Sequence, residues 1–387
     1  NTSIPFAEAP LGNWSNPYPS FTGVLPLKNP ALANGQGIDW YPANSNQLPY
    51  VQNWNFGIQY QMPAQTVLEV NYVANKGTRL IARGFQQPNN VPFSAVTQYG
   101  DILPRPWSAS SPIPAPYSGF VGTNLQALRP YPQYQRLDVY SSWPGANYKR
   151  NAASFRVEKR SSSGLTLNAT YEFSKQMDDY SGPYGTQDFY NKKNEWSLTS
   201  SNNPHRISLS FAYELPIGSK KSLLAYSDWR RYMVDGWSLS GITSIQSGEP
   251  LALRPQFNNT GGLVDALRVE LVPGVDPKVS DRGPNQWFNP AAFVQPADFT
   301  LGNGPRTHPQ ILNPGGQNHD LSVTKRFALT TERVLELTAT GFNFTNTGNW
   351  ADPDTMIGPA SAPNVNAGKI IGSRGGRVIQ VGMRLSF

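Results

Sequence analysis

A strict alternation of apolar and polar residues is the feature that most constrains this chain. In residues 377–387 every second side chain is apolar, from Ile379 to Phe387, and the residues between them are mostly polar or glycine. Because successive side chains of a β-strand point to opposite faces of a sheet, this pattern predicts a strand with one apolar and one polar face. The helical period of 3.6 residues is nearly absent from the sequence.

The same alternation recurs along most of the chain and predicts about nine strands of roughly 9–12 residues. The apolar pattern changes phase between Ala339 and Phe342, which predicts a β-bulge near Gly341. The expected strands are 51–62, 66–76, 148–160, 164–175, 204–215, 235–247, 316–327, 332–345 and 377–387.

Two folds explain such strands: a soluble β-sandwich with its apolar faces inward, or a membrane barrel with its apolar faces towards lipid. The connections favour the barrel, because short periplasmic turns alternate with long extracellular loops in outer-membrane barrels, and aromatic residues gather at the strand ends. The fold prediction is therefore all-β, an antiparallel transmembrane β-barrel. The short connections are Pro63–Gln65, Ser161–Gly164 and Ala328–Glu332, with 216–234 intermediate, and the long ones are about 75–147, 176–204, 247–316 and 346–376.

The direction of the strands follows from the last one, which in such a barrel ends on the periplasmic side with an aromatic residue, here Phe387. Counting back, the strand at 51–62 enters from outside, so residues 1–50, rich in Pro, Asn and Gly, are expected to be an irregular extracellular segment. A complete single-chain barrel has an even number of strands and both ends in the periplasm. We therefore expect 51–387 to be the C-terminal portion of a larger barrel.

Composition excludes several classes of function. The chain has no cysteine, which excludes disulfides, zinc fingers and iron–sulfur sites. Its formal net charge is +7, but the Lys and Arg residues are dispersed, so no nucleic-acid-binding patch is expected.

Few residues suggest a catalytic or metal site. His319 and Asp320 are adjacent in an expected strand, so they point to opposite faces and cannot pair as in a catalytic triad. Asp178 and Asp179 lie in an expected loop, but the sequence around them lacks the spacing of a calcium-binding EF-hand, and a solvated turn is the simpler reading. We expect no enzyme activity, no cofactor and no metal site.

The polar faces of the strands carry most of the functional information. A Lys or Arg on the lipid face of a barrel at the membrane midplane costs ~2–4 kcal/mol, so charged strand residues are expected to face the lumen. The candidate lumen-facing residues are Glu69, Asn71, Arg156, Glu158, Glu172, Arg206, Glu214, Arg326, Glu336, Gln380 and Arg384.

Short strand and turn phrases recur in a fixed order along residues 50–387. The phrases are 50–63, 70–80, 155–160, 164–165, 171–175, 177–179, 203–207, 213–218, 236–242, 247–250, 287–293, 318–322 and 341–346. Each phrase alone is weak, but their order is specific. In this order the chain resembles the barrel of large TonB-dependent outer-membrane receptors of the Oar-like type, which carry a carboxypeptidase-regulatory-like domain and are abundant in Acidobacteria.

The resemblance implies the function and the partners. It implies an outer-membrane receptor that imports a large or scarce solute, whose plug and TonB box are not found in this sequence. The expected partners are outer-membrane lipid, upstream barrel strands and a plug, TonB through that missing part, and the barrel-assembly machinery, which reads the strand ending at Phe387. Two other functions stay open: a structural or adhesion barrel that displays its long loops, and a soluble β-rich binding protein.

Overall fold

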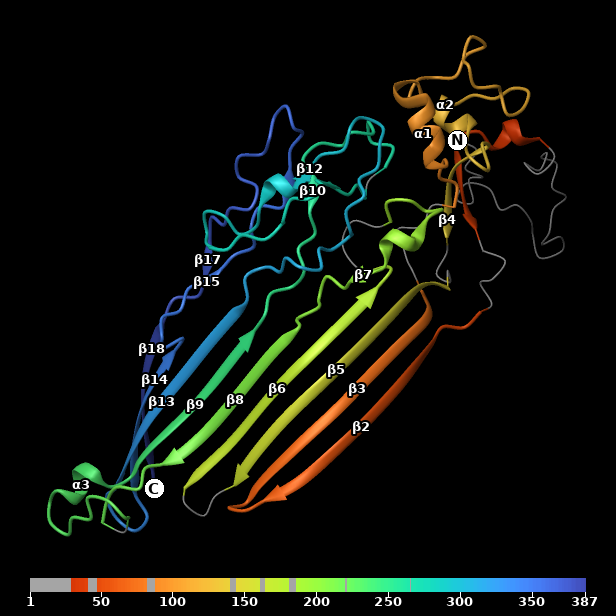
Figure 1. Cartoon of the computed structure of the whole chain (residues 1–387). Helices are drawn as coiled ribbons and strands as arrows, with labels where there is room; N and C mark the ends of the chain where they lie inside the picture. Colours follow the sequence, from red (N-terminus) through yellow and green to blue (C-terminus); the bar gives the residue numbers. More distant parts are fainter. Residues whose placement is uncertain are drawn as a thin grey trace, which may run out of the picture.

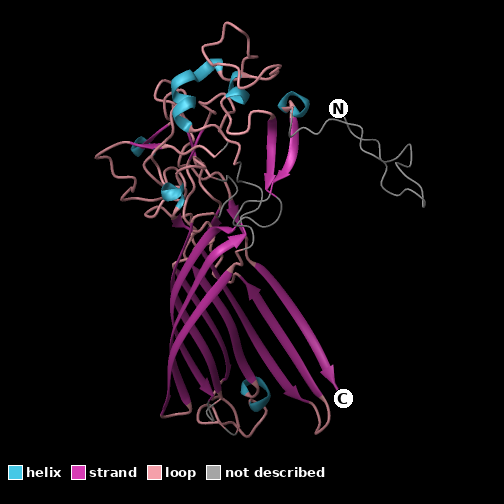
Figure 2. Cartoon of the chain, turned by 90° about the vertical axis from the view of Figure 1, so that its right-hand side faces the viewer, coloured by secondary structure: helices cyan, strands magenta, loops and turns pink. Residues whose placement is uncertain are grey.

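Nine long antiparallel strands form one sheet in a computed structural model of the chain, which describes residues 29–40, 47–81, 88–139, 144–160, 164–180, 186–219, 221–264 and 266–387. Strands that follow one another along the chain are neighbours in the sheet, which is curved (Figures 1 and 2). The predicted all-β antiparallel architecture is confirmed. The strands are β2 (Tyr50–Met62), β3 (Thr66–Ile81), β5 (Pro144–Arg160), β6 (Leu165–Asp178), β8 (His205–Glu214), β9 (Trp237–Gln246), β13 (Gly316–Ala328), β14 (Val334–Phe342) and β18 (Val378–Ser386).

Short and long connections lie at opposite ends of the sheet, as the sequence predicted (Figure 1). The tight turn Pro63–Gln65 joins β2 to β3, and both Ala64 and Gln65 adopt positive φ angles of 59° and 56° there. The longer connection between β8 and β9 lies at the same end and contains helix α3 (Arg231–Val234). All the long loops emerge from the other end.

The pairing register places most apolar side chains of the nine strands on one face of the sheet. One row across five strands illustrates this: Phe56 pairs with Tyr72, Tyr72 with Ala153, Ala153 with Phe173, and Phe173 with His205. A slip of one residue in any pair would move a whole set of apolar side chains to the polar face. The period-2 pattern of the sequence therefore defines the two faces of the sheet.

The predicted bulge lies two residues beyond Gly341, which pairs regularly with Leu321 and Ile379. Asn343 adopts a positive φ of 45°, and the Phe344 N–H donates to the carbonyl of His319 at 2.8 Å. The chain gains one residue at this point, so Phe344 lies on the apolar face beside Gly341, whereas Phe342 stays on the polar face with Asp320 and Thr340.

The two edge strands of the sheet are not paired with each other. Within the described residues, β2 pairs only with β3, and β18 pairs only with β14. Both faces of β2 and β18 are exposed along almost their whole length. The sheet is therefore open, with two free edges.

The described part of the N-terminal segment contains a short strand where the sequence predicted only irregular chain. A 3₁₀ turn, η2 (Pro30–Ala33), leads into β1 (Gln36–Trp40), which pairs in parallel with β4 (Tyr134–Val139) from the first long loop. Strand β1 is short and contains Gly37 and Asp39, residues with low strand propensity, so it left no strand signal in the sequence.

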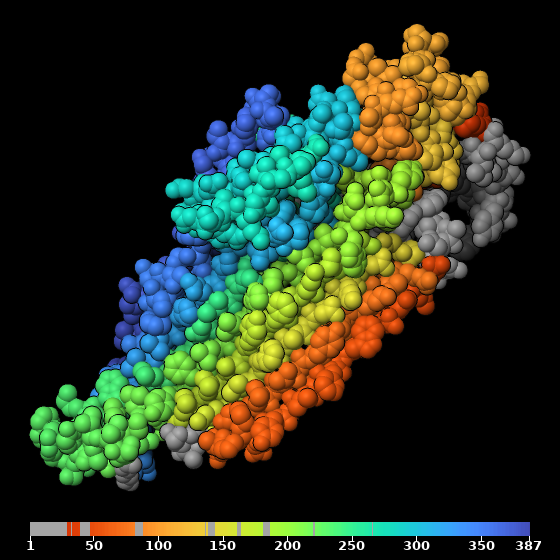
Figure 3. Space-filling model, viewed as in Figure 1, coloured from red at the N-terminus to blue at the C-terminus, as the bar shows by residue number. Residues whose placement is uncertain are grey.

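The long loops pack into a unit at one end of the sheet (Figure 3). This loop unit contains two apolar clusters of its own. The larger cluster joins the loops at 247–315 and 343–377, and Phe288 and Ile311 at its centre are completely buried. The smaller cluster joins the 82–143 loop, through Leu103 and Ile113, to Phe299. The helices are α1 (Phe93–Tyr99), η3 (Gly100–Ile102), α2 (Asn124–Ala127), η4 (Lys192–Glu195) and η5 (Pro290–Ala292), and the short strands are β7 (Ser197–Leu198), β10 (Arg254–Pro255), β11 (Glu270–Leu271), β12 (Phe293–Val294), β15 (Asn349–Trp350), β16 (Met356–Ile357) and β17 (Ser373–Arg374).

Among the described residues, no helix is long and apolar enough to cross a membrane.

Candidate functional site

Predicted polar residues from different strands meet on one face of the sheet, opposite the apolar face. The register places Glu69 of β3 directly opposite Arg156 of β5, and Glu172 of β6 opposite Arg206 of β8. Glu336 of β14 lies between Arg326 of β13 and Arg384 of β18 in the same way. Opposite charges that face each other across neighbouring strands stabilise the sheet and keep this face hydrophilic.

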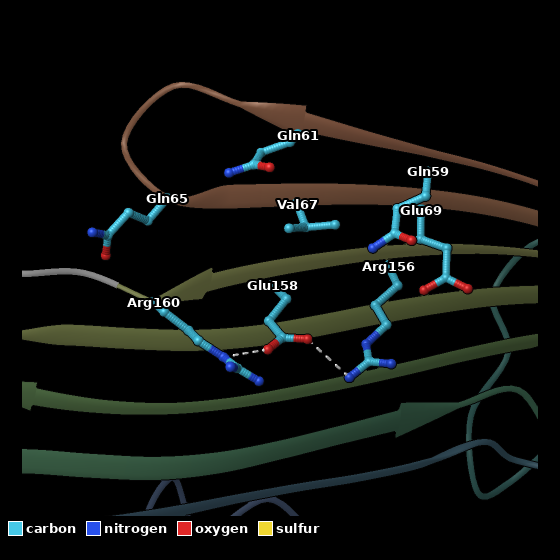
Figure 4. A pocket seen from close by; sticks show the side chains of 8 residues that line it. All are labelled: Gln59, Gln61, Gln65, Val67, Glu69, Arg156, Glu158 and Arg160. Atoms are coloured by element: carbon cyan, nitrogen blue, oxygen red, sulfur yellow. Dashed lines mark hydrogen bonds and ion pairs between the residues drawn. The ribbon is translucent and has the colours of Figure 1, made fainter.

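A hollow of about 450 Å³ lies on this polar face over β2, β3 and β5 (Figure 4). Glu158 is at its centre and accepts from the Arg160 Nε at 2.7 Å and from an Arg156 nitrogen at 3.2 Å. The amides of Gln59 and Gln61 face these charges from β2. The hollow is lined by Gln59, Gln61, Gln65, Val67, Glu69, Arg156, Glu158 and Arg160.

A second hollow, of about 420 Å³, spans five strands from β6 to β14 and is lined by small polar side chains together with apolar ones such as Ala212, Ile242 and Phe342. Next to it, hydroxyls pair across the strands, with 2.8 Å between Ser322 Oγ and Thr340 Oγ1. A hollow that extends over five neighbouring strands requires the sheet to curve towards the polar face, so that face is concave. Its polar lining includes Thr166, Asn168, Ser210, Ser240, Asp320, Ser322 and Thr340.

The other predicted residues are spread along the polar face and do not gather in one cluster. The Asn71 amide donates to Glu69 at 2.7 Å, and Glu172 forms a 2.8 Å ion pair with Arg150. Glu214 lies near the short-turn end, 3.3 Å from the Lys221 ammonium. Gln380 and Arg384 lie on the exposed edge strand β18. The described residues contain no group of three His, Cys, Asp or Glu side chains that could hold a metal ion.

The opposite face exposes large apolar side chains to an extent unusual for a water-soluble surface. On inner strands Phe173 is 49% exposed, Tyr72 45% and Ile207 40%, and on the edge strands Phe56 is 68% and Val381 78% exposed. These side chains form a continuous surface across the sheet, because the register aligns them strand by strand. A contiguous apolar surface of this size marks contact with a membrane or another protein.

Two histidines on the apolar face are bonded to hydroxyls of neighbouring strands. His205 Nδ1 lies 2.8 Å from the Tyr171 hydroxyl, and His319 Nδ1 lies 3.1 Å from Thr243 Oγ1. Asp320, on the polar face, instead accepts from the backbone N–H of Asn343 at 2.9 Å. His319 and Asp320 thus lie on opposite faces, as their adjacency in the sequence predicted.

A buried charge network ties the loop unit to the sheet and was not predicted from the sequence. Glu195, which is 2% exposed, forms a 2.8 Å ion pair with Arg268 and lies 3.9 Å from Arg306. Arg306 also pairs with Asp178 at the upper end of β6. Asp179, considered for calcium, accepts from the Asn147 backbone at 2.6 Å. Both aspartates therefore hold loops in place.

Comparison with solved structures finds distant similarity to outer-membrane receptors, while a search of curated proteins finds no match. The outer membrane transporter YddB from Escherichia coli has 11% identity and a TM-score of 0.45, over 92% of this chain and 34% of that chain. The ferripyoverdine receptor of Pseudomonas aeruginosa has 11% identity and a TM-score of 0.41, over 90% and 29%. The FrpB iron transporter from Neisseria meningitidis has 10% identity and a TM-score of 0.38, over 90% and 33%.

The chain thus spans about a third of the length of these structures. The family of outer membrane beta barrel domains matches residues 1–380, which is nearly the whole sequence. This match agrees with the antiparallel sheet and its exposed apolar face. The chain belongs to the outer membrane beta barrel domain family and is a protein of the bacterial outer membrane.

Proposed function

We propose that this chain forms part of the barrel wall of a TonB-dependent outer-membrane receptor that imports a large or scarce solute. One observation carries the proposal: a curved antiparallel sheet has an exposed apolar face on its convex side and a hollowed, charged face on its concave side. Such a wall separates lipid from an aqueous interior. The ordered resemblance of residues 50–387 to Oar-like receptors supports the same function.

The concave polar face would form the lumen. The hollow around Glu158 carries two guanidinium groups and several amides, which suit a hydrated passage or contact with a plug domain. The same charges on the convex face would each meet hydrocarbon, where a midplane Arg costs ~2–4 kcal/mol. Lumen-facing positions for the predicted polar residues, from Glu69 to Arg384, follow from this orientation.

The open edges of the sheet require further strands. Unpaired backbone N–H and C=O groups cost several kcal/mol each in hydrocarbon. Strands β2 and β18 are free on one side each and do not pair with each other. We therefore propose that additional barrel strands close the wall between β18 and β2, and that a plug fills the lumen of the whole protein.

A structural or adhesion barrel is the second candidate. The loop unit favours it, because two apolar clusters and a buried charge network give the surface loops a defined shape. A defined surface suits a binding partner outside the cell as well as it suits a solute. The two candidates differ in whether bound material enters the periplasm and whether entry requires TonB.

Uptake by whole cells tests the proposal. Cells that produce the entire protein, with and without a functional TonB complex, are offered labelled saccharides, peptides and ferric chelates. TonB-dependent entry of one class, absent from cells lacking the protein, supports the receptor. Surface binding without entry supports the adhesion barrel, and the absence of both contradicts a receptor.

A further inference from the structure

The connection between β8 and β9 folds back over the apolar face of the sheet, unlike the tight turn at Pro63–Gln65. The carbonyl of Met233, in α3, accepts from Lys325 Nζ at 3.1 Å and from Trp237 Nε1 at 2.7 Å. Lys325 and Trp237 pair with each other in β13 and β9, and both lie on the apolar face. The α3 connection, described at residues 215–219 and 221–236, is therefore held against the apolar face at the short-turn end of the sheet, where Figure 1 shows α3.

This contact buries a lysine on the apolar face. Lys325 is only 5% exposed, and its ammonium lies 5.2 Å from the ring of Trp237 and 4.8 Å from the ring of Phe327. Its ammonium donates hydrogen bonds to the carbonyls of Met233 and Asp235. An uncovered lysine here would face the lipid, so the α3 connection provides the polar partners that this charge needs.

The outer surface of the α3 connection is both apolar and basic. Its exposed side chains include Trp229 at 70%, Met233 at 65%, Leu223 at 57% and Tyr232 at 53%. The sequence of residues 215–236 also contains four basic and two acidic residues, so the segment carries a net positive charge. The mixture of aromatic rings and cations is typical of segments that lie in the boundary between lipid headgroups and acyl chains.

We propose that the α3 connection is an interfacial anchor that inserts into the lipid leaflet at the short-turn end of the sheet. Trp229 and Met233 would enter the boundary region, and Arg230 and Arg231 would lie near anionic phospholipid headgroups. The surface is continuous with the lipid-facing surface of the sheet, because α3 contacts that face directly. The proposal rests on the outer-membrane location of the chain and not on the transported solute.

Fluorescence quenching on single-cysteine variants tests the anchor, since the chain contains no cysteine of its own. Met233→Cys and Trp229→Cys are made in the whole protein, labelled with an environment-sensitive dye and reconstituted in vesicles of neutral and anionic phospholipid. Both side chains are exposed, so neither change removes a packing contact. Glu332→Cys, in the short connection between β13 and β14 at the same end, is the matched control.

The anchor predicts strong quenching at 233 and 229 by lipids with a nitroxide near the headgroup, several-fold more than at 332, and weak quenching by aqueous iodide. Strong iodide quenching at all three sites would overturn it, because the connection would then lie in water. Protection from both quenchers that depends on protein concentration would also overturn it, because a protein partner or a second copy would cover the surface. Quenching at these sites does not depend on whether the protein imports a solute. The anchor and the receptor function can therefore be disproved separately.

Discussion

Leu209 and Ser208 are neighbours in β8, yet the register places their side chains on opposite faces of the sheet. Leu209 pairs with Ala169 and Thr243 on the apolar face, while Ser208 pairs with Thr170 and Ser244 on the polar face. Leu209→Arg is expected to lower the free energy of unfolding by ~2–4 kcal/mol, because the guanidinium would face lipid. Urea unfolding of the whole protein in vesicles measures the change.

Ser208→Arg is the matched variant, and a much smaller loss is expected, because the concave face already carries Arg206 and other charges. Equal losses for the two variants would mean that the two faces meet similar surroundings, against the proposed orientation.

Glu195 is the residue on which the buried charge network of the loop unit depends. Its carboxylate faces Arg268 and Arg306 and accepts from the Gln187 backbone at 2.8 Å. Glu195→Gln is expected to destabilise the loop unit by ~3–5 kcal/mol, because it removes the negative charge that faces two buried guanidinium groups. Faster hydrogen exchange of amides in 186–202 and 266–271 would report this.

Asp101→Asn is the control for that substitution, since Asp101 pairs with Arg105 in an exposed part of the same loop unit. An exposed pair contributes only ~0–1 kcal/mol, so exchange near residue 101 should change little. Unchanged exchange around Glu195 would contradict a supporting role for the network.

His308 makes the stability of the loop unit depend on pH. Burial, and secondarily the charge of Lys278, lowers the pKa of His308 from 6.5 to about 4. Between pH 4 and pH 6.5 the unfolded loop unit therefore binds more protons than the folded one. The free energy of unfolding of the loop unit is highest above pH 6.5 and falls as the pH drops towards 4. Protease resistance of 250–311 in urea, compared at pH 7.5 and 4.5, measures this.

His308→Asn should reduce the difference between the two pH values, because it removes the titrating ring but keeps an acceptor for the Gln310 N–H, which bonds to His308 Nδ1 at 3.2 Å. An undiminished pH response in the variant would assign the effect to other groups.

At the scale of the element, β18 combines a free edge with an exposed aromatic residue. Phe387, which follows the strand, is 92% exposed. The resemblance assigns this residue to recognition by the assembly machinery, so Phe387→Asp is expected to lower the amount of assembled protein severalfold. Quantifying the protein in purified outer membranes tests this, with Phe257→Asp, at an exposed loop phenylalanine, as control. Normal assembly of the Phe387 variant would contradict the assigned role.

The strands could be predicted because their signal is local. Alternation over ten residues, as in 206–215, is sufficient to define a strand and its two faces. The same pattern could not explain Lys325, a charged residue on the apolar face. The α3 connection that covers its ammonium lies about 90 positions away in the sequence. The face on which each polar candidate lies could be predicted from its position in this alternation alone.

The loop unit and the hollows could not be predicted, because they depend on contacts between distant residues. Glu195 and Arg268 are 73 positions apart, and neither belongs to a recognisable motif. The hollow at Glu158 is lined by side chains of three neighbouring strands, from Gln59 of β2 to Arg160 of β5, and the space between them has no single-residue signal. Sequence therefore predicted the polar face but not the hollows on it.

At the scale of the whole molecule, the account rests on one orientation: the convex apolar face contacts lipid and the concave polar face lines an aqueous interior. To measure this orientation, a single cysteine is placed at each position from 206 to 213 in turn and labelled with a spin label. Each variant of the whole protein is reconstituted in vesicles. The accessibility of the label to lipid and to water is expected to alternate from one residue to the next. Labels at 207, 209, 211 and 213 should be accessible to oxygen dissolved in lipid, and labels at 206, 208, 210 and 212 to a water-soluble nickel complex. The reverse phase, or equal accessibility to the nickel complex at all eight positions, would contradict it.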